Sequence, residues 1–448
     1  MDYTITVDYG ISDYEIVNRK NGKADLVVGG TYLSYKDYEQ KNEMGADGDR
    51  IYVRILDENT GIPVVPWVKA ELLPNCKWEA KIYDVPEGGL YQLETKNKVK
   101  GKDWIEGGST GQIVSHFGVG DIYIIAGQSN ASGTGMGIGD DGPMLGVANL
   151  KSGEKWELAV HPLKDKHSPF LAFAKKVYKY TGIPIGLVNC AVGGSEIARW
   201  LPEQNGTLYN RMMSIAKEKD ISPNAILFYQ GCSDAGNPNY ETELKSLVEH
   251  MRKDFNNDKL PIYMFQLNAH YNAGKDDDYS DSWDEVREIQ RQMPKYYDNL
   301  YVIPTIGIPM SDGIHNSRSG NIILGERLAD YLLKYSFGKK IYAIAPELDS
   351  VSVEKDKTIC IRYKGVYSDM AGHFTDGNDI YRVEDSVGRI EISKVVTEYD
   401  TISLTLSREP VGAVYVSCQS GVENRQNLME ISTSVPPLVF FKVKAEIR

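Results

Sequence analysis

The chain has 448 residues, enough for two or three domains at about 150 residues each. Charged residues make up 25% and hydrophobic residues 42%, close to globular averages, which argues against general disorder and against a fibrous repeat. The formal net charge is −12 and no basic block stands out, so we expect no nucleic-acid partner. No apolar run reaches the roughly 18 residues of a membrane span, so none is expected.

The cysteines and the first residues bear on the cellular compartment. Five cysteines are odd in number, widely separated and without a Cys-x-x-Cys pair, so neither a disulfide framework nor a zinc ribbon is expected. The opening Met1–Thr4 lacks the charged and then apolar pattern of a signal peptide. The sequence leaves the cellular compartment undecided: the protein is either cytoplasmic or, if a signal peptide has been removed, secreted or periplasmic.

The first 117 residues read as strands and turns. Residues 50–56 and 78–83 alternate in polarity with a period of two, and clusters of Gly, Pro, Asn or Asp separate such segments. We predict a β-sandwich-like domain over residues 1–117.

The pattern changes over residues 118–338, where short apolar strands alternate with longer helical stretches. Expected strands cover residues 121–126, 185–188, 225–228, 262–266 and 300–303, and expected helices cover 169–180, 240–255, 282–292 and 322–335. This alternation is typical of parallel βαβ units with helices on both faces of the sheet, so the middle is predicted to be an α/β domain. Strand patterns return over residues 339–448, which predicts a β-rich C-terminal domain.

The ends of the predicted parallel strands carry unusual residues. In open α/β sheets ligands collect beyond the carboxyl ends of the strands. There the sequence places Gly127-Gln128-Ser129-Asn130, then residues 189–195, then Tyr229-Gln230-Gly231-Cys232, and last the segment from Asp312 to His315.

Ser129 and His315 could together perform nucleophilic catalysis. A serine is unreactive unless a base takes its proton, and Asp312 lies three residues before His315, close enough to orient the imidazole from the same loop. Taken alone, each residue is more often structural, Ser129 as a turn residue and His315 as a solvated loop histidine. The combination is the more specific signal.

At these segments the chain resembles the SGNH hydrolases, in particular the sialate O-acetylesterase-like carbohydrate esterases, from about residue 82 to 441. The segment 127–130, preceded by 119–123, is similar to the family's nucleophile block. The segment 183–188 with Gly193, Gly194, Ser195 and Trp200 is similar to the second block, Gln230-Gly231 to the third, and Asp312 with His315 to the last.

The resemblance implies a flavodoxin-like three-layer hydrolase domain and a set of roles. Ser129 would be the nucleophile, His315 the general base and then acid, and Asp312 its partner. The oxyanion would be held by the Ser129 and Gly194 backbone N–H groups and the Gln230 amide, a neutral donor. The alternative for Gln230 is a buried amide that stabilises its loop. No cofactor is implied.

Two departures from the family pattern concern carboxylates. The third block usually continues Gln-Gly-Glu, whereas Cys232 stands here, so the task of that acid is absent or moved to Asp234. Cys232 is read as a buried packing residue rather than a second nucleophile. The usual acid before the last block is also missing around residues 305–307, so Asp312 must serve alone.

Several of the remaining polar and aromatic side chains are candidates for substrate contact or metal binding. The candidate substrate contacts are Gln128, Asn130, Trp200 and Tyr229. Two further aromatics, Trp156 and Tyr271, also lie near the predicted loops. Packing under the loops explains each aromatic at least as well as contact with substrate. His161, His167 and His270 lack metal-ligand spacing and are read as structural or substrate-facing. No metal is predicted.

The leading hypothesis is an esterase that removes acetyl groups from an acetylated carbohydrate through an acetyl-serine intermediate. A lipase or thioesterase of the same fold would need an apolar acyl tunnel, which the small and polar residues around the blocks argue against. A non-catalytic carbohydrate-binding or surface protein on an esterase scaffold is the third possibility, and the joint presence of Ser129, Gln230, Asp312 and His315 argues against it. Which sugar carries the acetyl group stays open.

Overall fold

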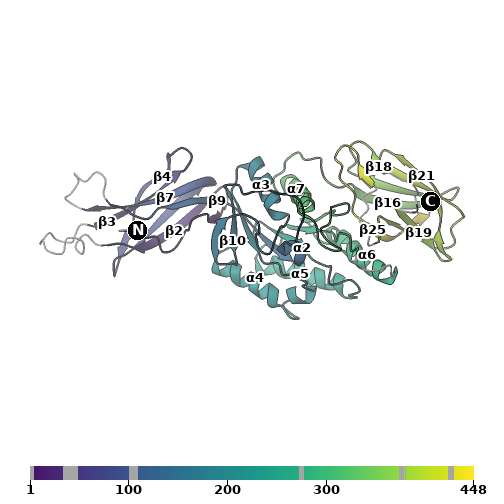
Figure 1. Cartoon of the computed structure of the whole chain (residues 1–448), viewed down its shortest axis with the longest axis horizontal. Helices are drawn as coiled ribbons and strands as arrows, with labels where there is room; N and C mark the ends of the chain where they lie inside the picture. Colours follow the sequence, from purple (N-terminus) through teal and green to yellow (C-terminus); the bar gives the residue numbers. More distant parts are fainter. Residues whose placement is uncertain are drawn as a thin grey trace.

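The computed structural model describes residues 5–33, 49–99, 109–271, 277–372, 378, 380–421 and 428–447. Three regions follow one another along the long axis of the molecule: N-terminal β-sheets, a central α/β region, and C-terminal β-sheets (Figure 1). The predicted fold class, a central α/β domain with β-rich flanks, is confirmed.

Two sheets face each other across an apolar core in the N-terminal region. One consists of β2 (Lys23–Thr31), β6 (Lys77–Pro86) and β5 (Glu71–Leu73); the other contains β3 (Asp49–Asp57), β4 (Pro63–Lys69), β7 (Gly88–Val99) and β8 (Ser109–Thr110). Alternate residues of both sheets, among them Val28, Ile82, Val53 and Leu93, are buried between them. The period-two alternation in the sequence therefore marks the inward face of each strand.

Strand β9 (Val114–Gly127) joins this region to the central sheet. Its first half pairs with β7, its middle pairs with β1 (Ile16–Asn18), and its second half pairs with β12 and β13. The boundary predicted at residues 117/118 therefore falls inside one continuous strand. The division into three domains stays a prediction.

The central sheet has the order β11-β10-β12-β9-β13-β14-β15. All neighbours are parallel except the edge pair of β10 and β11, and the five strands β9, β12, β13, β14 and β15 lie in the order 2-1-3-4-5 by chain position. Their bounds are β10 Val147–Lys151, β11 Lys155–Leu158, β12 Ile185–Asn189, β13 Ala225–Tyr229, β14 Ile262–Phe265 and β15 Leu300–Ile303. In this flavodoxin-like order, successive connections leave β9 in opposite directions, and ligands bind at that switch point.

Helices cover both faces of the sheet. α3 (Phe170–Thr181) and α7 (Arg318–Tyr335) pack together on one face, and α4 (Thr207–Glu218) and α5 (Tyr240–Asp254) cover the other (Figure 1). Among the described residues, the other named helical segments are α2 (Ser129–Ser132), α6 (Asp277–Gln292), η1 (Ile197–Trp200) and η2 (Met293–Lys295). β10, β11 and α4 were not predicted from the sequence.

The C-terminal region is built from β-strands only, among its described residues. A five-stranded sheet contains β21 (Ile392–Glu398), β22 (Thr401–Leu406), β17 (Thr358–Lys364), β16 (Glu347–Glu354) and β26 (Glu446–Ile447). A four-stranded sheet contains β20 (Gly388–Ile390), β19 (Tyr381–Asp385), β23 (Tyr415–Cys418) and β25 (Phe440–Lys444), and β18 (Met370–Gly372) pairs with β24 (Leu428–Glu430). One apolar cluster lies between these sheets.

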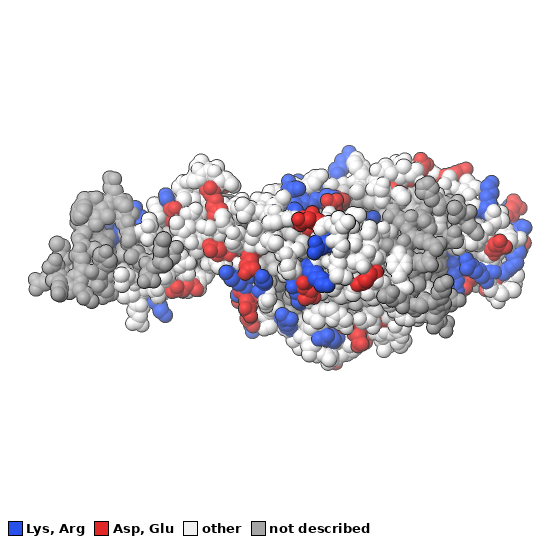
Figure 2. All heavy atoms as spheres, in the orientation of Figure 1, with Lys and Arg blue, Asp and Glu red and all other residues white. Residues whose placement is uncertain are grey.

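The surface and the helices give two further observations. On the face drawn in Figure 2, the coloured acidic and basic side chains are interspersed rather than gathered into a tract of one sign. Within the described ranges, no helix combines the length and the apolar character needed to cross a bilayer.

Candidate active site

Ser129 lies where β9 ends, at the switch point of the sheet. It is the first residue of α2 and directly follows the turn at Gly127 and Gln128. Gly127 has φ 128°, and a Cβ at that position would lie 2.1 Å from the Tyr229 carbonyl oxygen. Only glycine tolerates both conditions. The glycine therefore allows the chain to turn sharply against β13 and present Ser129 at the sheet edge.

Ser129, His315 and Asp312 form one hydrogen-bonded chain. Ser129 Oγ is 3.0 Å from His315 Nε2, and His315 Nδ1 is 2.8 Å from Asp312 Oδ2. Ser129 lies at the end of β9, whereas His315 and Asp312 lie in the loop before α7. Ser129 and His315 are 186 residues apart in the sequence. The structure thus brings together the three residues that the sequence analysis named, in the order needed for proton transfer.

The Asp312 carboxylate is held by more than the histidine ring. Its Oδ1 accepts the backbone N–H groups of Ile314 at 2.9 Å and His315 at 2.8 Å. Burial tends to raise the pKa of Asp312, but these hydrogen bonds and the His315 ring outweigh burial and lower it. Asp312 is therefore ionised at neutral pH, as a group that orients an imidazole must be.

Asn130 ties the serine turn to the histidine loop. Its Nδ2 donates to the Ile314 carbonyl oxygen at 3.2 Å, and its Oδ1 accepts the Asn316 N–H at 3.1 Å. Asn316 Oδ1 in turn accepts from Asn268 Nδ2 at 2.8 Å. Asn130 was proposed as a substrate contact, but it is buried and both ends of its amide are used within the protein. Asn316 and Asn268 were missed, although Asn316 directly follows His315.

Two backbone N–H groups near Ser129 are available as donors. As the first residue of α2, Ser129 has no acceptor for its N–H within the helix. No acceptor is found among the described residues for the N–H of Ser129 or of Gly194. A Cβ on Gly193 would come within 3.7 Å of Ser129 Cβ, and one on Gly194 would meet nothing within 4 Å. The Gly193–Gly194 turn therefore borders an open space beside Ser129.

The assignment of Gln230 as an oxyanion donor is contradicted by its hydrogen bonds. Gln230 is fully buried, and its Nε2 donates to the Ser195 carbonyl oxygen at 3.2 Å and to Asp234 Oδ2. An amide NH2 has only two hydrogens. Its Oε1 accepts from the Tyr240 hydroxyl at 3.3 Å. Gln230 is thus the loop-stabilising buried amide that was the alternative reading.

Three other expected substrate contacts are also buried. Gln128 Oε1 accepts the backbone N–H groups of Gly231 at 3.0 Å and Cys232 at 2.8 Å, which holds the loop after β13 beside Ser129. Trp200 is fully buried and donates from Nε1 to Ser195 Oγ, and Tyr229 is fully buried under the sheet edge. Both aromatic side chains therefore pack inside the protein, as the alternative interpretation had it, and neither can face a sugar.

Cys232 and Asp234 occupy the loop where the family pattern has an acid. Burial raises the pKa of the Cys232 thiol to about 12, so the side chain is an inert packing group at neutral pH. Asp234 is buried and accepts the Ile197 N–H at 3.2 Å as well as the Gln230 amide. Burial raises the pKa of Asp234, and these bonds oppose the rise. Asp234 thus fixes the loop and η1.

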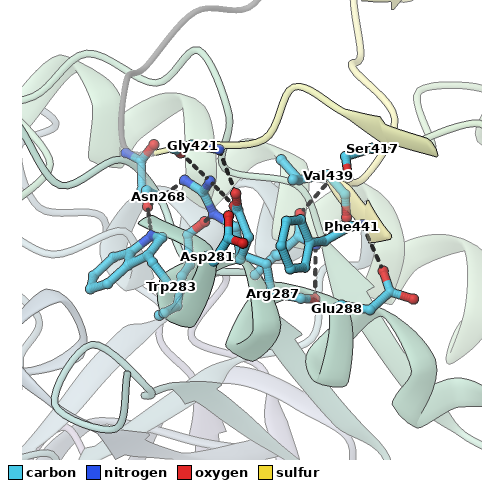
Figure 3. Close-up of polar contacts among 12 residues, drawn as sticks. Asn268, Asp281, Trp283, Arg287, Glu288, Ser417, Gly421, Val439 and Phe441 are labelled. Atoms are coloured by element: carbon cyan, nitrogen blue, oxygen red, sulfur yellow. Dashed lines mark hydrogen bonds and ion pairs between the residues drawn. The ribbon is translucent and has the colours of Figure 1, made fainter. Parts of the chain in front are cut away.

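Arg287 of α6 supports the site from behind and was not assigned a role by the sequence analysis. Its fully buried guanidinium donates to the carbonyl oxygens of Leu267 at 3.0 Å, Asn268 at 2.7 Å and Gly421 at 2.6 Å, and pairs with Asp284 at 2.9 Å (Figure 3). Leu267 and Asn268 follow β14, and Gly421 belongs to the C-terminal region. One side chain therefore joins the loop that contacts Asn316 to the C-terminal sheets.

Further bonds continue this contact between α6, β14 and β25. Gln266 exchanges two hydrogen bonds with the Val439 backbone, at 2.8 and 2.9 Å, and Glu288 Oε2 accepts the Phe441 N–H at 3.2 Å (Figure 3). His270, at the end of the same loop, bonds the Tyr279 hydroxyl at 3.0 Å, and burial followed by the charge of His315 lowers its pKa. The loop after β14 thus lies between the C-terminal sheets and the histidine loop.

Residues 119–334 match the family described as carbohydrate esterase, sialic acid-specific acetylesterase. A probable carbohydrate esterase of Arabidopsis thaliana is 28% identical over 248 residues, which covers 47% of this chain and 90% of that protein. The resemblance expected from the sequence motifs is confirmed.

A solved structure has the same architecture over nearly the whole chain. A carbohydrate acetylesterase from Xanthomonas citri has a TM-score of 0.66 at 18% identity, covering 97% of this chain and 98% of that chain. The solved Arabidopsis thaliana protein has a TM-score of 0.42 at 28% identity and covers 48% of this chain and 98% of that chain. The first similarity extends over the flanking β-regions as well as the central sheet.

Proposed function

We propose that this chain, whose residues 119–334 match the family described as carbohydrate esterase, sialic acid-specific acetylesterase, hydrolyses acetyl esters on sugar hydroxyls through an acetyl-serine intermediate. The observation that carries the proposal is the hydrogen-bonded chain from Ser129 Oγ through His315 to Asp312. Its ends lie on two separate segments, at the strand ends where this type of sheet binds ligands.

Acylation would begin with proton transfer from Ser129 Oγ to His315 Nε2 as the oxygen attacks the acetyl carbonyl carbon. The imidazolium that forms is stabilised by the Asp312 carboxylate. Negative charge develops on the carbonyl oxygen, to which the Ser129 and Gly194 N–H groups would donate. Collapse of the tetrahedral intermediate breaks the bond to the sugar oxygen, and His315 Nε2 returns the proton to that oxygen.

Deacylation repeats the sequence with water as nucleophile. His315 takes a proton from the water as it attacks the acetyl-serine carbonyl carbon. The same two N–H groups hold the oxyanion, and collapse releases acetate as the proton passes to Ser129 Oγ.

The alternatives fit the site less well. A lipase or thioesterase would need a long apolar channel, whereas the residues next to Ser129 are Gly193, Gly194, Gln128 and Asn130. A binding protein without activity would have no need of a serine, an imidazole and a carboxylate in hydrogen-bonding contact. A mixed pattern of surface charge with an acidic total favours neutral or weakly charged glycans over strongly anionic polymers.

The test compares acyl length and then sugar identity. Rates on p-nitrophenyl acetate, butyrate and octanoate would be measured for the full chain and for Ser129→Ala, followed by acetate release from acetylated sialic acid, xylan and pectin. We expect acetate to be preferred and Ser129→Ala to be inactive. Preference for octanoate would support the lipase alternative, and equal rates in both proteins would support the binding-protein alternative.

A further inference from the structure

Asp141, His161 and His167 form a cluster outside the proposed catalytic chain. Asp141 lies in the loop between α2 and β10, and the two histidines lie in the loop between β11 and α3. Asp141 Oδ1 is 2.9 Å from His167 Nε2 and 3.1 Å from His161 Nε2, and the potential ligand atoms of the three residues all lie within 4.8 Å of one another. The spacing in sequence gave no metal motif, so the histidines had been read as structural or substrate-facing.

The cluster is buried and incompletely hydrogen-bonded. Asp141 is 9% exposed and His167 is 4% exposed. Among the described residues, Asp141 Oδ2, His161 Nδ1 and His167 Nδ1 have no hydrogen-bond partner, and His161 Nε2 has only its 3.1 Å contact with Asp141 Oδ1. Buried polar atoms are normally paired, so three unpaired atoms in one cluster indicate a ligand that the protein side chains do not supply.

The charge of the cluster also calls for a cation. Among the described residues, the ion-pair partners of the Asp141 carboxylate are His161 and His167 alone. The neighbouring Lys175 directs its Nζ to the backbone carbonyl oxygens of Asp141 and Gly142, at 2.9 and 2.7 Å, and not to the carboxylate. The charge on Asp141 is thus left to be balanced by the imidazoles or by a bound ion.

The donor set selects the kind of ion. Zn²⁺ binds imidazole nitrogens and carboxylate oxygens at about 2.0–2.1 Å, which in a tetrahedron places ligand atoms about 3.3 Å apart. The two measured separations lie within a few tenths of an ångström of that value. Ca²⁺ and Mg²⁺ prefer sites made of oxygen ligands alone. The stacked His161 and His167 rings, with centroids 3.9 Å apart, both present Nε2 to the same carboxylate oxygen.

We propose that Asp141, His161 and His167 bind one zinc-class divalent transition-metal ion, which fastens the loop after the serine helix to the loop before α3. One backbone bond already joins these loops, because Gly135 N–H donates to the His167 carbonyl oxygen at 3.0 Å. Asn321 Nδ2 of α7 donates to the same oxygen at 2.9 Å. Three protein ligands leave the fourth position to water. The ion's role is structural, because no hydrogen bond or ion pair joins the three ligands to Ser129, His315 or Asp312.

The test is metal binding by the full chain, with Zn²⁺ and Co²⁺ as probes. After dialysis against a chelator and removal of the chelator, we expect the chain to take up one Zn²⁺ per molecule in calorimetry, with a rise in Tm. Co²⁺ should give the visible absorption of a site with nitrogen ligands and low coordination number. Failure of the wild-type chain to bind either ion stoichiometrically would overturn the proposal without any variant, whatever its effect on esterase activity.

Variants locate the ion. Asp141→Asn, which keeps the side-chain shape, and His161→Ala, at the most exposed of the three positions, should each weaken Zn²⁺ binding at least tenfold and remove the Co²⁺ absorption. His250→Ala is the matched control, because His250 also lies 3.0 Å from a carboxylate, Glu203, on the far face of the sheet. Equal loss in the control, or full Zn²⁺ binding in both cluster variants, would overturn the assignment.

Discussion

The backbone N–H of Asn316 donates to Oδ1 of Asn130 at 3.1 Å, so the residue that follows the proposed base is bonded to the residue that follows the proposed nucleophile. Asn130 Nδ2 completes the contact through the Ile314 carbonyl oxygen, on the other side of His315. The 3.0 Å separation of Ser129 Oγ and His315 Nε2 is therefore fixed by bonds on both sides of the histidine. Positioning, and not only residue identity, makes the serine reactive.

Asn130→Ala should reduce turnover without removing any reacting group. Both bonds to the histidine loop are lost, and a displacement of about 1 Å at the reacting atoms costs about a hundredfold in rate. We expect kcat for p-nitrophenyl acetate to fall by about that factor with KM little changed. Asn149→Ala, which removes another buried amide whose Nδ2 bonds the Leu163 carbonyl oxygen, should keep kcat near wild type. Equal kcat in the two variants would remove the positioning role.

Asp312→Asn should cost about 10⁴ in kcat, because the amide cannot stabilise the imidazolium and favours the wrong tautomer of His315. Asp234 is the carboxylate that could have taken over the task of the missing third-block acid. It contacts Ile197 and Gln230 instead, so Asp234→Asn should leave the acid role intact. Single and double variants would be compared in acetate release. A severe loss that appears only in the double variant would show that Asp234 is the acid.

Gln230→Ala separates the two readings of this amide. If Gln230 only holds its loop, the variant leaves Asp234 and the Ser195 carbonyl oxygen without their buried donor, and unfolding free energy should fall by about 1–3 kcal/mol. An oxyanion donor would instead lower kcat by about 10²–10³ with stability unchanged. Denaturant unfolding and initial rates on the same preparation decide between them. We expect the stability loss to dominate.

The contrast between strands and side chains shows what local sequence can reveal. β15 was predicted to the residue because a short apolar segment between polar turns specifies its own ends. α4 was missed although Leu208, Met212 and Ile215 recur at helical spacing, so its signal was present in the sequence. The sequence carries no signal for the direction of the Gln230 side chain, because its partners at positions 195, 234 and 240 are set by how three loops meet.

The residues of the site also divide into those that local sequence reveals and those that it does not. Ser129, Asp312 and His315 were identified because family motifs mark them and two of them share one loop. No role was predicted for Arg287, since its acceptors lie after β14 and in the C-terminal region, more than 130 residues away in the case of Gly421. Asp141, His161 and His167 lie in two irregular loops, where spacing along the chain carries no metal signature.

Arg287→Met should destabilise the fold. It removes a buried guanidinium that bonds Leu267, Asn268 and Gly421 and leaves the Asp284 carboxylate buried without its partner, a change that costs about 3–5 kcal/mol. Adding Asp284→Asn should recover part of that loss, because the uncompensated charge is gone. Chemical denaturation of both variants measures the difference. No recovery in the double variant would mean that lost bonds, not the charge, cause the damage.

The loss in Arg287→Met should also depend on pH. Burial raises the pKa of Asp284 in the folded chain, and Arg287 opposes the rise, so removing the arginine raises that pKa further. An acid whose folded pKa exceeds its unfolded value of about 3.9 favours the folded state at low pH and loses that contribution as pH rises. The stability deficit relative to wild type should therefore be smallest near pH 4 and grow toward pH 7. A deficit that is constant over this range would contradict the assignment to Asp284.

Tyr271 is the aromatic side chain we expect to contact the sugar. Of the four aromatics considered near the site, Trp156, Trp200 and Tyr229 are buried, whereas Tyr271 is 51% exposed. Its backbone N–H donates to the Gly313 carbonyl oxygen at 2.7 Å, which places it beside the loop of Asp312 and His315. An aromatic face against the C–H face of a sugar ring is expected to contribute about 0.5–1.5 kcal/mol, by analogy with other aromatic contacts.

Tyr271→Ala should therefore raise KM for an acetylated sugar by about two- to tenfold, the factor that corresponds to that energy. The rate on p-nitrophenyl acetate, which has no sugar ring, should stay near wild type because the reacting groups are untouched. Tyr296→Ala is the matched control, since Tyr296 is 54% exposed and lies beyond η2, against Lys245. A similar KM increase in the control, or an equal loss on both substrates in Tyr271→Ala, would show that Tyr271 supports the loop and does not bind the sugar.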